Sequence, residues 1–436
     1  MLTPSRRSRA LYARHVSIAM LVSATLALGA CSSDDDGDDL ASITDDEVID
    51  TADADTDDGD GGGETGEGIE DVLAADGDTA AFVATAAPDF TSGRVDRLAI
   101  DGESFIVNGS FPATISDLRV GTIDGDMVEV ARFGTSTLAR YDADDTSAPI
   151  WEFSVNGEDA DANPQDVIFD DAGFGYVTRF GGDELFVIDP DVTQDQEDLF
   201  VSTSFDLGAY DEDAPNMTDA VIVDGLLFVL IERLTDGFNP SQPGYVAVFD
   251  LATGLEVPTG QGADGLDGIE LETINPTALQ YDEDSGLIYL AGRGNFFLSP
   301  SVPGDPFTGG VESIDPVTFE NTLLIDDGTE EDNIGFFTDL HVVSATQAYI
   351  SVPGEVFPNA SLLIANPAEG TIEETPVAGL ESAPIFVIAE DATGRIWVGL
   401  GGDEPGFRFL DPATNTLSDE IIRTELNPID IAFTSN

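Results

Sequence analysis

The sequence has 436 residues, of which 42% are hydrophobic, enough to bury a large core. It carries 86 Asp and Glu against 15 arginines, with no lysine, and a formal net charge of −71. Because such a surface repels phosphates, nucleic-acid binding is excluded. The acidity resembles that of proteins from salt-loving microbes, although a genome that favours arginine codons would give the same arginine bias.

Residues 1–30 are predicted to form a lipoprotein signal peptide. Four arginines precede the mainly apolar residues 16–30, a run too short to span a bilayer. The run ends in Leu-Gly-Ala before Cys31, the only cysteine of the chain, which excludes an internal disulfide. These residues resemble the bacterial lipobox, which implies acylation of Cys31. By the same resemblance, Ser32 implies sorting to the outer membrane, facing either the periplasm or the medium. An ordinary cleaved signal with an incidental cysteine is the alternative.

After the cysteine, a tether is predicted. Residues 32–78 contain twenty Asp and Glu and no basic residue, with Gly, Ser, Thr and Ala filling most of the rest. Such a composition cannot bury enough apolar surface to fold. We therefore expect 31–78 to be the lipidated cysteine and a disordered acidic linker, and 79–436 to be the folded domain.

From residue 79 onward, short β-branched and apolar segments alternate with Gly, Asp and Pro turns, a pattern typical of antiparallel strands. Two hairpin types recur every 40 to 60 residues. One has an acidic or glycine turn, as in the segment at 167–179, and the other ends in Asp-Pro or an equivalent turn, as in the segment at 185–192. Each pair of hairpins predicts one four-stranded unit, strands A to D. Six complete units are expected at 116–157, 163–206, 214–258, 275–326, 335–379 and 383–424.

Two fragments remain at the ends of this region. Residues 80–109 supply three strands, and residues 427–436 supply one that resembles a strand A. Joined, they make a seventh unit and remove the open edges of the ring. The sequence thus predicts an all-β, seven-bladed β-propeller in which terminal strands share one blade.

The repeats, such as LFVIDPDV from Leu185 and FRFLDPATN from Phe407, resemble those of the YVTN and quinoprotein-like propeller families. The resemblance covers residues 80–436 and implies the fold. Such folds host lactonases, dehydrogenases and binding scaffolds. The tryptophan-docking repeat of quinoprotein dehydrogenases is missing, since only Trp151 and Trp397 occur.

Charged residues recur where strand A begins and strand B ends. Strand A is innermost in a propeller, so its carboxylates are expected to ring one mouth of the central channel. In a hairpin, the start of A lies beside the end of B, which predicts ion pairs within a blade. The expected pairs are Asp117 with Arg132, Asp166 with Arg179, and Asp219 with Arg233.

Two further strand-A carboxylates, Asp339 and Asp430, have no such arginine in their own blades. Unpaired carboxylates at a channel mouth raise each other's pKa or bind a hard cation, so a Ca²⁺ site is a candidate here. The alternative is a purely structural ring of ion pairs.

The connections that leave this mouth are unusually long in the third to sixth units. Elaborated loops on a rigid scaffold commonly carry binding residues. The candidates for the ligand face are Arg293, Phe238, Phe296, Phe297, Phe307 and His341. Alternatively, the aromatic residues plug the channel, and His341, the only histidine after the signal peptide, is a core residue.

These features favour a membrane-anchored, monomeric binding scaffold whose ligand is a protein, a polymer or a small molecule. No catalytic residues are assigned, because the mature chain offers no lysine and no cysteine other than the anchoring one, and its scattered carboxylates do not resolve into an acid–base pair. Two alternatives are a lactonase-type hydrolase that uses a cation at Asp339 and Asp430, and a propeller subunit associated with a redox cofactor.

Overall fold

The computed structural model describes residues 80–102, 104–211, 214–235, 240–295, 306–354, 356 and 358–434. Cys31, the predicted tether, Phe238, Phe296 and Phe297 lie outside these ranges. Within them, no helix combines the length and the apolarity needed to cross a membrane.

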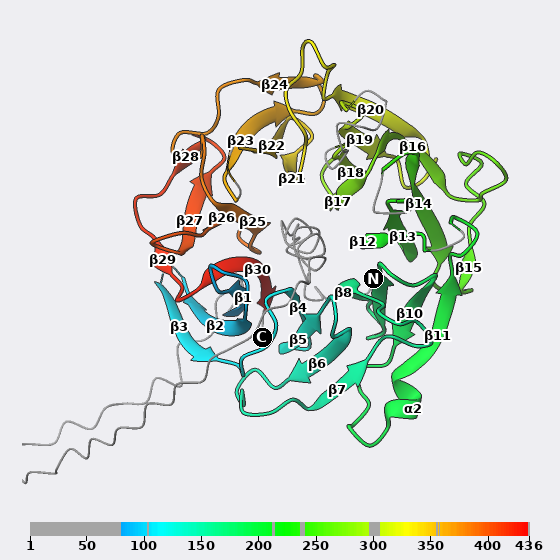
Figure 1. Ribbon diagram of the computed structural model, residues 1–436, viewed down its shortest axis with the longest axis vertical. Coiled ribbons are helices and arrows are strands. Elements are labelled where there is room, and N and C mark those ends of the chain that lie inside the picture. Colours follow the sequence, from blue (N-terminus) through cyan, green and yellow to red (C-terminus); the bar gives the residue numbers. More distant parts are fainter. Residues whose placement is uncertain are drawn as a thin grey trace, which may run out of the picture.

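The described chain forms seven antiparallel sheets arranged in sequence order around a centre, as Figure 1 shows. This confirms the predicted all-β propeller and its number of blades. We number the blades from the one that contains β1 and letter their strands A to D from the centre outward. The first three sheets contain β30 (Asn427–Thr434), β1 (Ala80–Ala86), β2 (Gly93–Asp101) and β3 (Ser104–Ser110); β4 (Leu118–Ile123), β5 (Asp126–Ala131), β6 (Thr137–Tyr141) and β7 (Trp151–Ser154); and β8 (Pro164–Phe169), β9 (Gly175–Arg179), β10 (Glu184–Ile188) and β11 (Val201–Asp206), which follows the short helix α2 (Glu197–Phe200).

Blades four to seven follow the same plan. In the fourth and seventh sheets, the third strand pairs with two separate segments at its outer edge. The four sheets contain β12 (Met217–Val223), β13 (Leu226–Ile231), β14 (Pro243–Asp250), β15 (Leu255–Glu256) and β16 (Ile269–Ile274); β17 (Pro276–Asp282), β18 (Leu287–Gly292), β19 (Gly310–Ile314) and β20 (Asn321–Asp326); β21 (Asp339–Ser344), β22 (Gln347–Pro353), β23 (Ala360–Asn366) and β24 (Thr371–Glu373); and β25 (Ile385–Glu390), β26 (Ile396–Leu400), β27 (Gly406–Asp411), β28 (Thr416–Leu417) and β29 (Ile422–Arg423).

The ring is closed by its two ends. β30 pairs antiparallel with β1, from Ala80 opposite Thr434 to Ala86 opposite Asn427, so the last strand becomes the innermost strand of the first blade. In Figure 1 the red β30 lies beside the blue β1. Every residue of both strands is buried. The stitched blade predicted from the two leftover fragments is therefore confirmed.

The core consists of seven apolar clusters, each formed mainly by two neighbouring blades. Between the second and third blades, for example, Val128 and Trp151 pack in one cluster with Val167 and Val177. The alternation of apolar residues along each strand supplies both faces of every sheet, and their burial is the main stabilising term of the fold.

Local turn chemistry fixes the hairpins. The A–B turns at Asp124-Gly125 and Asp224-Gly225 place both residues of each pair at positive φ, the geometry that Asp-Gly favours between twisted strands. At the C–D turns, a carboxylate accepts a hydrogen bond from the amide two residues later, as Asp250 Oδ1 does from Ala252 at 2.9 Å. Both turn types lie at the same ends of the blades, which we call the turn face. The B–C and D–A connections make the opposite, long-loop face.

Candidate functional site at the central channel

The inner strands β4, β8, β12, β17, β21, β25 and β30 surround the centre of the ring (Figure 1). Some of their polar side chains satisfy backbone groups of the next blade. Asp430 Oδ2 accepts a hydrogen bond from the Val120 amide at 2.9 Å, and Asp219 Oδ2 accepts one from Leu279 at 2.9 Å. Because inner strands have one edge without a β partner, these bonds tie neighbouring blades together. Part of the predicted carboxylate ring therefore has a structural role.

The predicted partners Asp117 and Arg132 lie together. Arg132 Nη1 is 3.4 Å from Asp117 Oδ1, and Nη2 donates a hydrogen bond to Gln165 Oε1 in the third blade. Arg132 is 1% exposed. Burial lowers its pKa, whereas Asp117, Asp430 and Asp166 raise it, so one buried guanidinium serves carboxylates from three blades.

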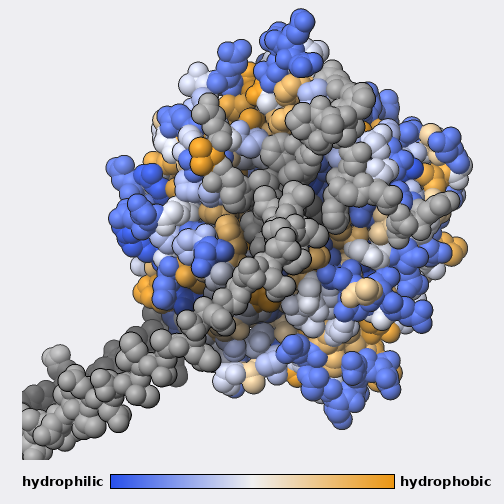
Figure 2. Space-filling view, in the orientation of Figure 1, coloured by the Kyte–Doolittle hydropathy of each residue, from blue (hydrophilic) through white to orange (hydrophobic). Residues whose placement is uncertain are grey.

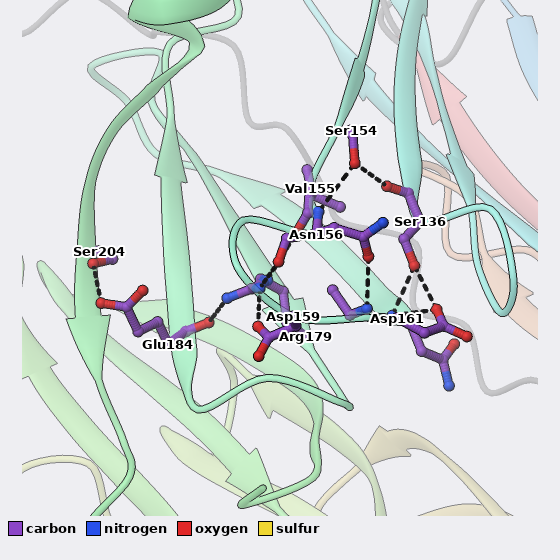
Figure 3. Close-up of polar contacts among 11 residues, drawn as sticks. Ser136, Ser154, Val155, Asn156, Asp159, Asp161, Arg179, Glu184 and Ser204 are labelled. Carbon is purple, nitrogen blue, oxygen red and sulfur yellow. Dashed lines mark hydrogen bonds and ion pairs between the residues drawn. The ribbon is translucent and has the colours of Figure 1, made fainter.

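The predicted pair of Asp166 and Arg179 is wrong. Arg179 forms its ion pair with Asp159, in the loop between β7 and β8 (Figure 3). Asp166 is opposite Thr178, next to Arg179, and successive side chains of a strand point to opposite faces. Arg179 also donates to the carbonyl oxygens of Val155 at 2.8 Å, Asn156 at 2.6 Å and Glu184 at 2.9 Å, and stacks on Phe186.

The predicted pair of Asp219 and Arg233 is also wrong. Arg233 follows the end of β13 with φ of 56°, and its guanidinium donates to the carbonyl oxygens of Tyr210 at 3.0 Å and Pro243 at 3.4 Å. The guanidinium carbon lies 4.9 Å from the centre of the Tyr245 ring. Like Arg179, this arginine fastens loops of the long-loop face.

A buried ion pair that the sequence did not predict joins the fourth and fifth blades. Arg293, expected on the ligand face, instead is 7% exposed and donates to Glu232 Oε1, 61 residues away. Glu232 is fully buried, and burial raises its pKa to about 7 although Arg293 and Arg132 lower it. The sequence feature that could have pointed to this pair is the charged residue Glu232 directly before Arg233.

The two candidate calcium ligands differ in their surroundings. Burial raises the pKa of Asp339 to about 7; Asp219 adds to this increase, while the Leu340 amide and Arg119 oppose it. Asp430 accepts the Val120 amide described above. In the part of the chain that the structure describes, no group of three or more His, Cys, Asp or Glu side chains is placed to hold a metal ion. The calcium site at Asp339 and Asp430 stays a prediction.

The remaining candidates lie apart from one another. His341 is 4% exposed, and its Nε2 is 3.5 Å from Glu390 Oε2 in the neighbouring seventh blade. Phe307 lies in the long B–C connection of the fifth blade and stacks on Phe336, with ring centres 5.0 Å apart and an interplanar angle of 11°. Both rings are half-buried. The stack therefore presents aromatic surface on the long-loop face.

The arrangement separates two chemical environments. The channel holds buried carboxylates and arginines that link blades, including Arg119, which sequence reasoning missed although it is the charged residue of an otherwise uncharged inner strand. The long-loop face holds the accessible aromatic stack. The aromatic stack is therefore partly open to solvent, whereas the channel groups are buried.

Comparisons with known proteins found similar solved structures at low sequence identity. No protein-family model matches the chain, and no curated protein matched it. Among solved structures, hydrazine synthase of Kuenenia stuttgartiensis is similar at 14% identity, covering 83% of this chain and 100% of that chain, with a TM-score of 0.49. Virginiamycin B lyase from Staphylococcus aureus has 13% identity, 74% and 92% coverage and a TM-score of 0.44. A putative 6-phosphogluconolactonase from Bacteroides fragilis has 11% identity, 85% and 100% coverage and a TM-score of 0.42.

Proposed function

We propose that the protein is an exported, lipid-anchored scaffold of the cell envelope that binds a ligand through its long-loop face. The anchor rests on the sequence, where the lone Cys31 ends the apolar run 16–30. The binding role rests on the contrast between the two faces. The turn face has the tight hairpin turns, whereas on the long-loop face the chain takes 11, 17 and 12 residues to connect β13 to β14, β18 to β19 and β20 to β21.

The observation that carries the proposal is the stack of Phe307 on Phe336. It brings together the connection before β19 and the connection before β21, so it lies between the fifth and sixth blades. Ile334 is 37% exposed and Val356 is 68% exposed on the same face. An aromatic stack with exposed apolar residues on the same face of so acidic a protein supports a binding surface there.

Charge limits the ligand. The segment before the stack exposes Glu330, Glu331 and Asp332, and Figure 2 shows a largely hydrophilic surface with small separate hydrophobic patches. A polyanion would be repelled, because like charges are only partly screened within about 10 Å at 0.1 M salt. The proposed ligand is therefore neutral or cationic and offers a flat apolar surface to the aromatic stack, as a sugar ring of an extracellular polymer does.

Replacing the anchor tests the first half of the proposal. Cys31→Ser should move the protein from the membrane fraction to the soluble fraction, while Ser33→Ala should leave it in the membrane. Immunoblots of separated fractions measure this. A processed Cys31→Ser protein that still sediments with membranes would contradict the lipid anchor.

Changing the stack tests the second half. Washed cell envelopes from a strain that lacks the protein serve as the probe, and retention of the purified mature protein is measured. Phe307→Ala with Phe336→Ala should lower retention about tenfold, as loss of an aromatic anchor does. Phe174→Ala is the matched control, because Phe174 is 39% exposed on the turn face. Equal retention of the double variant and the control would refute the role of the stack.

A further inference from the structure

A pocket of about 340 Å³ lies in the seventh blade, at the turn face and away from the channel. It is formed by the end of β27, the C–D turn that follows it, β28 and the A–B turn. Its size falls in the lower range of small-molecule sites. The lining residues are Arg395, Phe409, Leu410, Asp411, Pro412, Thr416, Leu417 and Ser418.

Arg395 supplies the positive charge of this pocket. Its guanidinium carbon lies 4.9 Å from the ring centre of Phe105 and 4.9 Å from that of Phe409. The two rings hold the guanidinium in place by cation–π contact. Phe105 comes from the first blade and Phe409 from the seventh, so the arginine lies where the two blades meet. The side chain is 25% exposed, so ligands in water reach it.

Arg395 already forms an ion pair with Asp391, but its two Nη groups are not used by that contact. Its Nε lies 3.6 Å from Asp391 Oδ2, and within the described ranges its side chain makes no hydrogen bond. Asp391 is committed elsewhere, because Oδ2 accepts from Trp397 Nε1 at 2.9 Å and Oδ1 accepts from the Thr393 amide at 2.9 Å. The two Nη groups of Arg395 can therefore bind both oxygens of an incoming carboxylate.

The two other arginines of the seventh blade already donate hydrogen bonds. Arg423 donates to Glu404 at 3.0 Å, and Arg408 donates to the Ser418 carbonyl at 2.7 Å. The pocket wall also includes an acid, but Asp411 is held by its own turn, with Oδ1 accepting from Ala413 at 2.9 Å and Oδ2 from Thr414 at 2.9 Å. Leu410, Pro412 and Leu417 make the apolar part of the wall, beside the polar residues Thr416 and Ser418.

We propose that this pocket binds a small organic carboxylate attached to an apolar or aromatic group. The carboxylate pairs with Arg395, and the apolar part lies against Phe409, Leu410 and Leu417. The ligand should carry one negative charge, because one guanidinium faces the pocket. The domain has 66 acids against 11 arginines, so a second negative charge on the ligand would be repelled. This site is separate from the long-loop face and does not depend on the function proposed for it.

The test uses 3-phenylpropanoate as the probe and its neutral amide, 3-phenylpropanamide, as the matched control ligand. The full mature protein is titrated with each at millimolar concentration, and affinity is followed by calorimetry and by the shift in melting temperature. The acid should bind at least about tenfold more tightly than the amide, because only the acid forms the charge-assisted pair. Equal affinity, or no binding of the acid, overturns the proposal.

Three variants locate the site. Arg395→Gln should weaken binding of 3-phenylpropanoate about tenfold or more. Leu417→Trp should do the same by filling the pocket while leaving Arg395 in place, which keeps the test valid if the first variant is unstable. Arg423→Gln, on the long-loop face and 56% exposed, removes the same charge elsewhere and should leave binding unchanged. An equal loss with Arg423→Gln, or full binding by Leu417→Trp, overturns the proposal.

Discussion

The blades on the two sides of the ring connect similar strands in different ways. On the tight side, by which we mean blades one to three, the B–C connections have four to six residues. There the buried Arg179 has three carbonyl oxygens and Asp159 as acceptors. On the long-loop side, by which we mean blades four to six and not the long-loop face, the B–C connections of the fourth and fifth blades have 11 and 17 residues. Glu232 and Asp339 are buried there, with pKa values raised to about 7. The buried arginine on the tight side is thus held by backbone acceptors, whereas two buried carboxyl groups on the long-loop side have pKa values raised by burial.

The largest expected effect comes from breaking the tight side at its seam. Deleting residues 427–436 removes β30, whose eight residues are all buried, and exposes the edges of β1 and the bonds at Val120. We expect the protein to lose its cooperative unfolding transition. Without β30 the first blade loses its innermost strand and much of its buried core, and the net stability of a domain is typically only about 5–15 kcal/mol. Calorimetry of the mature protein measures this. Deleting residues 32–78, the predicted tether, is the control and should leave the transition unchanged; similar melting curves for both deletions would contradict the closure.

The seam also shows what the sequence could predict. The Asp-Gly turns, the alternating strands and the two complementary fragments identified seven blades, because these signals are local or lie at the chain ends. The partners of Arg179 could not be identified, since the irregular register between Pro164 and Asp166 turns the arginine away from the expected acid. The pair of Glu232 and Arg293 spans 61 residues and depends on the packing of two blades, which no spacing in the sequence encodes.

A second prediction compares a buried arginine from each side. Arg179→Met should destabilise the protein by about 3–5 kcal/mol at every pH from 5.5 to 8, because it leaves three carbonyl oxygens without their donor. Arg293→Met should cost less at pH 5.5 than at pH 8. At the lower pH Glu232 is already protonated in the folded protein, so the loss of the positive charge matters less.

Urea unfolding of both variants at the two pH values measures these costs. The comparison depends on the difference in pH response between the two variants rather than on either value alone. A cost of Arg293→Met that is the same at pH 5.5 and pH 8 would show that Glu232 does not adjust its charge. The two sides would then hold their buried ions in the same way.

The third prediction concerns the titration itself. The folded-state pKa values of Glu232 and Asp339, about 7, lie above the ordinary values of 4.5 and 3.8. Folding therefore favours the protonated forms: their contribution is fully present below pH 4 and is lost as the pH rises through 7. We expect unfolding free energy to fall between pH 5 and pH 8 by an amount on the order of a few kcal/mol.

Glu232→Gln with Asp339→Asn should flatten that dependence. Loss of overall acid repulsion at low pH acts in the same direction, so a surface control is needed. Asp144→Asn removes a carboxylate that is 92% exposed and should leave the slope as in the unmodified protein. The prediction fails if the buried double variant keeps the full slope.

The smallest effect should come from single loop contacts. On the tight side, Asp161 accepts from Ser136 Oγ at 2.7 Å, the Gly134 amide at 3.0 Å and the Asn163 amide at 3.2 Å, so it clamps one loop to the next. On the long-loop side, Gln242 Nε2 donates to Asp211 Oδ2 at 3.2 Å and to the Arg233 carbonyl at 3.1 Å.

Asp161→Ala should destabilise the protein by about 1–2 kcal/mol, because it removes three hydrogen bonds to a charged group. Gln242→Ala should cost about 0.5 kcal/mol or less, since its two bonds are 3.2 and 3.1 Å long and lie in a connection that tolerates change. Hydrogen exchange of the amides of Gly134 and Asn163 tests the clamp directly, because those amides should exchange faster in Asp161→Ala and unchanged in Gln242→Ala. Equal costs and equal exchange in the two variants would mean that the tight and long-loop sides are equally constrained, and the distinction between them would rest on loop length alone.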